Sequence, residues 1–215
     1  MMRNAVLIAA TVVSGLFGQQ PPVNVVPLPI INPVSVAPKA NVEPLTPTDK
    51  AQLTLRNIFG PRAVANRLLV AGLDQWKGHP YEFGGGMEGF GTRFGSRMGR
   101  LAARNSVRLA TDVAFGIDPR YDRCLCSGFW RRTAHAWKRI VVSRSDSGSQ
   151  MPAFSNFTGA YVTPMITYTW YPDRLDTWNR KLQSGTTNLT WRGVTNMIRE
   201  FWPDIKKRTP IIRDE

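Results

Sequence analysis

Five arginines with a regular spacing are the residues of this sequence whose chemistry is easiest to define. At 100° per residue of helix they fall within a sector about 80° wide, and they are Arg93, Arg97, Arg100, Arg104 and Arg108. Five guanidinium groups on one face repel one another unless something anionic covers them. Because a planar guanidinium can bind two phosphate oxygens at once, this arginine stripe predicts an anion-binding surface. The alternative is a solvated face without a partner, screened by salt.

The opposite face of the same predicted helix carries small residues. Gly91, Gly95, Gly99, Ala102 and Ser106 fall in a second sector of similar width. Such a small-residue stripe lets another helix backbone approach closely, which would offset the helix propensity that each glycine loses. We therefore expect Gly95→Leu to damage folding far more than Arg97→Gln.

Two phenylalanines, Phe90 and Phe94, lie between the two stripes. Beside arginines they are suited to shallow insertion into a lipid surface while the guanidiniums bind head groups. We accordingly count them with the arginines as candidate lipid-binding residues.

Catalytic and metal-binding motifs find little support. The two cysteines, Cys124 and Cys126, and the distant histidines, His79 and His135, lack the paired spacing of zinc sites. A bridge between cysteines two residues apart is strained, so intermolecular pairing and free thiols both stay open. No catalytic residue, metal ligand or cofactor is predicted.

The glycines at 84, 86 and 89 match a dinucleotide-binding pattern in spacing only. That pattern requires a hydrophobic strand directly before it, and residues 79–83 do not provide one. We interpret the segment as a loop that leads into a helix.

Charge is unevenly distributed along the chain. Its 28 Lys and Arg outnumber 15 Asp and Glu, and residues 93–144 hold twelve basic and three acidic residues. A field of one sign attracts polyanions, anionic lipid or an acidic partner. A protein exported from the cytoplasm, as the amino-terminal residues of this chain indicate, would not meet chromosomal DNA.

The amino-terminal residues indicate export. Met1, Met2 and Arg3 precede an apolar stretch from Ala5 to Val13, which is shorter than the 20 or so residues that a membrane span needs. Small residues near Gly18 are typical of a signal peptidase site. We predict a signal peptide at 1–18, cleaved before Gln19, and an uncleaved anchor is the alternative.

The remaining chain is predicted to be mainly α. Recurrent prolines make 19–47 an extended linker, a helical domain covers 48–205, and a basic tail covers 206–215. Within the domain, helices are expected at 49–59 with Thr48 as cap, 61–76, 91–115, 129–142, 153–170, 174–184 and 187–202. Residues 143–150 are expected to form a polar loop.

A stretch without charges runs from Ser147 to Pro172. Its length would suit a membrane span, but threonines, Gly159 and Pro164 lower its hydrophobicity. We interpret it as buried or interfacial, and a true span is the alternative.

Several short motifs together resemble an uncharacterised family of bacterial exported proteins, for which no activity is known. The resemblance covers about residues 55–205 and implies export and a shared helical domain, without implying chemistry. It is carried by residues 82–84, 91–97, 118–121, 128–132 and 170–173.

The leading functional hypothesis is a non-enzymatic binding or structural protein of the cell envelope. It would associate with an anionic membrane surface or an envelope polyanion through the arginine stripe, and a homo-oligomer is an additional option. The alternatives are an integral membrane protein packed through the small-residue stripe and a periplasmic enzyme of unknown chemistry. Carbonate extraction, which releases only peripheral proteins, would separate the first two.

Overall fold

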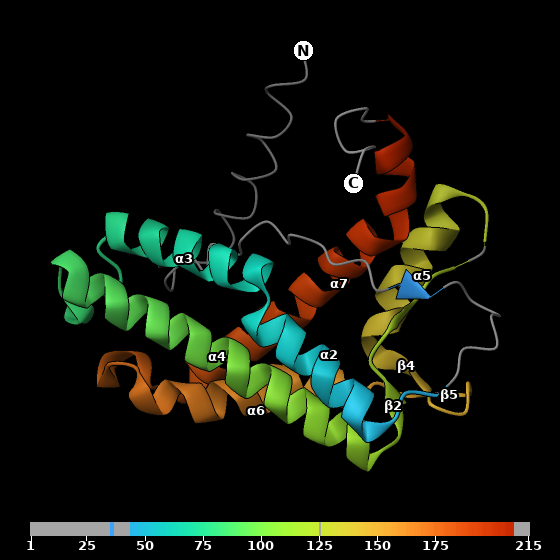
Figure 1. The fold of residues 1–215 in the computed structure, drawn as a ribbon, viewed down its shortest axis with the longest axis horizontal. Helices are drawn as coiled ribbons and strands as arrows, with labels where there is room; N and C mark the ends of the chain where they lie inside the picture. Colours follow the sequence, from blue (N-terminus) through green and yellow to red (C-terminus); the bar gives the residue numbers. More distant parts are fainter. Residues whose placement is uncertain (1–34, 37–43, 125, 209–215) are drawn as a thin grey trace.

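The computed structural model describes residues 35–36, 44–124 and 126–208, and it confirms a mainly α fold (Figure 1). The predicted signal peptide at 1–18, most of the linker and the end of the tail lie outside the described residues. Figure 1 shows helix α4 between α3 and α6, with the long helix α7 running diagonally behind them.

Helices α2 (Pro47–Phe59) and α3 (Pro61–Trp76) meet at Gly60. Helix α2 begins two residues earlier than expected because Thr46, and not Thr48, is its cap. The Thr46 hydroxyl accepts from the Asp49 N–H, and the Asp49 carboxylate accepts from the Thr46 N–H, which is a reciprocal capping box. Pro47 fits the first turn, where its missing N–H costs no helical hydrogen bond.

Helix α4 (Gly86–Ala114) packs against α2, α3 and α6 (Phe154–Thr167). It begins directly after the glycine loop, as the sequence indicated, but five residues earlier than the predicted start. Gly89 is required there, since a Cβ would lie 2.5 Å from the Gly84 carbonyl oxygen.

Two small sheets lie beside the helices. Strand β2 (Ile117–Asp118) pairs antiparallel with β4 (Val142–Ser145), which pairs antiparallel with β5 (Gln150–Pro152). The segment expected to be a loop at 143–150 is therefore mostly a hairpin, whose turn uses Gly148 at φ 87°. Strand β1 (Ser35–Val36) pairs parallel with β3 (Tyr121–Asp122). Helix α5 (Phe129–Val141) connects the two sheets.

Helix α7 (Trp178–Arg208) is continuous where two helices were predicted. Gly185, expected to end the first of them, lies inside α7 and faces the ring of Tyr161. A Cβ on Gly185 would lie 2.3 Å from that ring, so the glycine permits close packing of α7 on α6 and does not stop the helix. The helix also continues through Pro203 and takes in the first residues of the predicted tail.

Many polar side chains lie inside this fold and many large apolar ones lie outside. Arg93, Asn196 and Glu200 are at most 2% exposed, whereas Trp130 is 79% exposed. Within the described residues, no helix combines the length and apolar character needed to cross a membrane. The uncharged stretch at 147–172 forms β5, α6 and the 3-10 turn Tyr168–Trp170.

The small-residue stripe of α4 has the opposite orientation to the one we expected. Gly91 and Gly95 are exposed, and a Cβ on either would meet no atom of the described chain within 4 Å. Ser106 is exposed as well, and Gly99 contacts only the ring of Trp170. The prediction that these glycines admit a neighbouring helix of the same chain was wrong, because α4 turns its arginine side toward α2, α3 and α7.

We therefore expect Gly95→Ala to stabilise the protein and Gly185→Ala to destabilise it. An alanine in an open helical position should add about 0.5–1 kcal/mol, whereas a methyl group forced against Tyr161 should cost about 1–3 kcal/mol. Thermal unfolding followed by circular dichroism measures both. Equal shifts for the two variants would contradict the placement of these glycines.

Candidate anion-binding site

A recess of about 680 Å³ opens where the junction of α2 and α3 meets α4, α6 and α7. Eleven basic residues line it, and Asp112 is its acidic residue among those described. The basic lining residues are Lys50, Arg56, Arg62, Arg67, Arg97, Arg100, Arg104, Arg108, Arg120, Arg192 and Arg199.

Four of the five stripe arginines line this recess, so α4 forms one of its walls. Arg97, Arg100, Arg104 and Arg108 are half-buried there. They do not form the flat, outward face that the membrane hypothesis required. Arg97 pairs with Asp74 of α3, and the Arg100 guanidinium lies over the rings of Tyr168 and Tyr171.

Arg93 has a structural role and does not line the recess. It is 2% exposed, and its guanidinium donates to the carbonyl oxygens of His79, Pro80 and Gly84 at 2.7–3.0 Å. It also donates to the Gln75 side chain at 2.6 Å. Counting Arg93 among the anion-binding residues was wrong, since its donors already bind the loop before α4. Phe90 and Phe94 are half-buried and do not line the recess either.

Three arginines of the recess were missed by the sequence analysis. Arg67 comes from α3, and Arg192 and Arg199 come from α7. The last two are seven residues apart, which places them on the same side of a helix. That spacing could have indicated that the two arginines share a helix face. It was overlooked because α7 was predicted to be broken and because few other charges lie nearby in the sequence.

Part of the basic lining is neutralised within the protein. Arg97 pairs with Asp74 at 2.6 Å, Arg120 with Asp118 at 2.7 Å, and Lys50 with Asp146 at 2.7 Å. The three carboxylates belong to residues that are not part of the lining. The paired cations contribute less to an incoming anion than unpaired ones would.

The inner arginines lack such close ion pairs, and the charge of Asp112 acts on Arg108 and Arg192 from a longer distance. Among the described residues, no carboxylate lies within 4 Å of the guanidinium of Arg67, Arg104, Arg108, Arg192 or Arg199. The Nε atoms of four of these, Arg104 being the exception, are buried without a hydrogen-bond partner in the described chain. Because buried polar groups are normally hydrogen-bonded, it is unusual that these four donors lack a partner.

The pKa values of several inner arginines lie below the ordinary value for arginine. Burial, and then the neighbouring charges of Arg67, Arg108 and Arg100, lower the pKa of Arg104 to about 9. The pKa of Arg67 and that of Arg199 fall to about 10, mainly through burial, and the pKa of Arg192 is also well below its ordinary value. At neutral pH Arg67, Arg104 and Arg199 are still protonated, so the recess is strongly positive.

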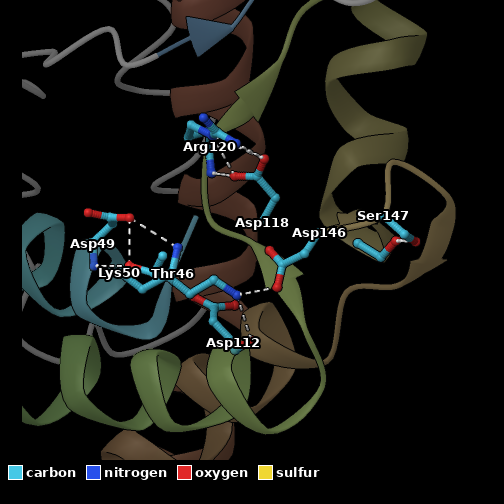
Figure 2. A network of polar contacts seen from close by, with 9 residues as sticks. Thr46, Asp49, Lys50, Asp112, Asp118, Arg120, Asp146 and Ser147 are labelled. Atoms are coloured by element: carbon cyan, nitrogen blue, oxygen red, sulfur yellow. Dashed lines mark hydrogen bonds and ion pairs between the residues drawn. The ribbon is translucent and has the colours of Figure 1, made fainter. Parts of the chain in front are cut away.

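Lys50, Asp112 and Arg120, which line the recess, belong to a polar network (Figure 2). Lys50, from α2, is 3% exposed and donates to the backbone carbonyl of Asp112 at 3.1 Å and to the Asp146 carboxylate at 2.7 Å. The Asp112 side chain is also buried, and burial raises the pKa of its carboxyl group. In the same view Arg120 binds Asp118 through two nitrogens.

Elsewhere, Cys124 and Cys126 form a disulfide with each other, with 5.1 Å between their Cα atoms. This corrects the expectation of free or intermolecularly paired thiols. No cluster of three or more potential metal ligands occurs among residues that the structure describes.

The Glu200 carboxylate accepts from the Tyr121 hydroxyl and from the Cys124 N–H, and it pairs with Arg132. These contacts anchor α7 to the segment before α5.

No protein-family model, curated protein or solved structure matches this chain. The resemblance to a family of exported proteins therefore stays a prediction.

Proposed function

We propose that this protein is a non-enzymatic binding protein that takes a phosphate-bearing anion into the arginine recess. The observation that carries the proposal is the charge of the recess, where eleven basic residues face a single acidic one among the described residues. Five of the guanidiniums have no carboxylate partner in that part of the chain. An anion would satisfy their donors and relieve their mutual repulsion.

Phosphate oxygens fit this lining better than a lone carboxylate does. A guanidinium binds two phosphate oxygens with parallel hydrogen bonds, and several guanidiniums surrounding one recess can bind several phosphate oxygens. The volume of about 680 Å³ is within the range of about 300–1,000 Å³ that small-molecule sites usually have. We therefore expect a ligand of small-molecule size, with more than one negative charge.

The recess also changes the membrane hypothesis. A flat bilayer surface cannot reach Arg104 or Arg192, which lie on facing helices α4 and α7 inside the recess. An anionic group must enter to contact them, whether it belongs to a soluble phosphate compound or to the head group of an anionic lipid. Action at the cell envelope is part of the proposal, and it depends on the predicted signal peptide.

Tripolyphosphate binding, measured by isothermal titration calorimetry, tests the proposal. We expect binding by the wild type that weakens from low to high salt, because the contacts are between charges. Arg192→Gln should weaken binding about 10- to 100-fold, since a hydrogen bond to a charged group contributes about 1.5–3 kcal/mol. Arg131→Gln makes the same charge change on an exposed residue outside the recess and should bind as the wild type does.

Vesicles of phosphatidylglycerol, compared with neutral vesicles, distinguish the two sources of phosphate. Vesicle binding that is lost in Arg192→Gln, without tripolyphosphate binding, would identify a lipid head group as the ligand. The proposal fails if neither probe binds, or if Arg192→Gln binds as tightly as the Arg131→Gln control.

A further inference from the structure

Two hydrogen-bond acceptors lie inside the arginine recess without a partner. Asp112 and Asn156 both line it, and their side chains are 4% and 6% exposed. The Oδ1 atom of each is buried and accepts no hydrogen bond from the described residues. A fully deprotonated anion cannot satisfy these atoms, because it carries acceptors and not donors.

The orientation of the Asn156 amide is determined by the backbone of α5. Its Nδ2 donates to the carbonyl oxygens of Arg139 at 3.2 Å and Ile140 at 2.9 Å. Because Nδ2 is held by these two acceptors, Oδ1 must be on the other side of the amide group. Asn156, a lining residue of the recess, therefore holds a buried acceptor without a partner in the described chain, and flipping the amide would lose both bonds.

Asp112 and Asn156 belong to the same end of the recess. On α4, Asp112 is one turn after Arg108, and the Arg108 side chain crosses Gly159 so closely that a Cβ there would lie 2.5 Å from its Cγ. Gly159 is three residues after Asn156 on α6. The hydroxyls of Thr111 and Thr158, 2.8 Å apart, join the two helices at this level.

The recess thus offers guanidinium donors along its length and two acceptors at one end. A simple polyanion would satisfy the donors and leave both acceptors buried and unpaired, at a cost in binding free energy. A ligand that brings hydroxyl groups next to its phosphates satisfies both sets. Burial raises the pKa of the Asp112 carboxyl, while the charge of Arg108 and a hydrogen bond with the Ser155 side chain lower it, and Oδ1 is the carboxylate oxygen left without a partner in the described chain.

We propose that the ligand is a phosphate ester of a polyhydroxy compound. Its phosphate groups bind the inner arginines, and its hydroxyl groups donate to Asp112 and Asn156. This inference rests on the proposed anion-binding function and specifies the chemical class of ligand for that site. It assigns Asp112 and Asn156 as specificity-determining residues.

Two bisphosphates of matched charge and carbon number test the inference. Fructose 1,6-bisphosphate carries hydroxyl groups, and hexane-1,6-diyl bisphosphate carries none. We expect the wild type to bind the sugar compound at least about tenfold more tightly, as one or two well-made hydrogen bonds to buried acceptors provide. Affinities are measured by isothermal titration calorimetry in one buffer.

Asp112→Leu removes one acceptor and also one negative charge. The lost charge should strengthen binding of both bisphosphates to a similar extent, so the ratio of their affinities isolates the hydrogen bond. We expect the preference for the sugar compound to fall several-fold in Asp112→Leu and to be kept in the exposed-site control Arg131→Gln. Circular dichroism checks that the variant is folded, and if it is not, the wild-type ratio alone decides.

Equal affinities of the wild type for the two bisphosphates would overturn the inference, as would an unchanged ratio in folded Asp112→Leu. Failure of both bisphosphates to bind, with tripolyphosphate still bound, also overturns it and leaves the proposed anion-binding function standing. Failure of all three compounds and of the anionic vesicles would remove both proposals.

Discussion

Arg93→Met is expected to be among the most destabilising single substitutions in this protein. Arg93 is 2% exposed and donates to three backbone carbonyls and to Gln75. Methionine fills much of the same volume but donates nothing, so buried carbonyl oxygens of the loop before α4 lose their partners. Unsatisfied buried acceptors cost about 1–3 kcal/mol each, and we expect a total loss of about 3–5 kcal/mol.

Thermal unfolding followed by circular dichroism measures this loss. For a chain of this size, a change of 1 kcal/mol shifts the melting temperature by about 2–4 °C, so a fall of about 10 °C is expected. Arg93→Lys keeps the charge but not the planar fork, and it should lie between the wild type and Arg93→Met. A melting temperature within about 2 °C of the wild type for Arg93→Met would contradict the structural role of this residue.

Arg104→Met is expected to have the opposite effect on stability and to remove anion binding. The Arg104 guanidinium has no carboxylate within 4 Å in the described part of the chain, and burial and three neighbouring arginines lower its pKa to about 9. The folded state therefore disfavours its charge relative to the unfolded state. Replacing such a group with an apolar one of similar length should stabilise the ligand-free protein by about 1–2 kcal/mol.

The melting temperature of ligand-free Arg104→Met should accordingly rise by about 2–8 °C. Adding tripolyphosphate should raise the melting temperature of the wild type, because a ligand stabilises the state that binds it, and it should have little effect on the variant. Arg131→Met, on the exposed side of α5, serves as the control and should respond to tripolyphosphate as the wild type does. If Arg104→Met is less stable than the wild type and keeps the tripolyphosphate response, the inner arginines are structural and the binding proposal is wrong.

Local sequence patterns were sufficient to place most of the helices. Pro61 at a first helical turn and the residues from Gly78 to Pro80 correctly bounded α3, and the aromatic spacing of 154–168 predicted α6. The arginine spacing on α4 correctly placed Arg97, Arg100, Arg104 and Arg108 on one side of a helix. These features depend on local backbone geometry, and the residues that cause them are neighbours in the chain.

Which side of α4 faces inward depends on how the other helices pack around it. Charged side chains are almost never fully buried unless paired, so the arginine stripe was assigned to the surface and the glycine stripe to the interior. The desolvation cost of Arg93 is offset by carbonyl oxygens from residues 79–84. Arg104 is instead half-buried in the recess among other arginines, and both arrangements depend on chain segments outside α4.

The recess itself could not be predicted from any one segment. Arg67, Arg104 and Arg192 come from α3, α4 and α7 and line the same recess. Helix α7 is continuous and packs closely on α6 through Gly185. The sequence showed a glycine and could not distinguish a helix stop from a close contact, since both require the absence of a side chain. The contact with the ring of Tyr161, 24 residues earlier in the chain, shows that Gly185 is a close-packing position and not a helix stop.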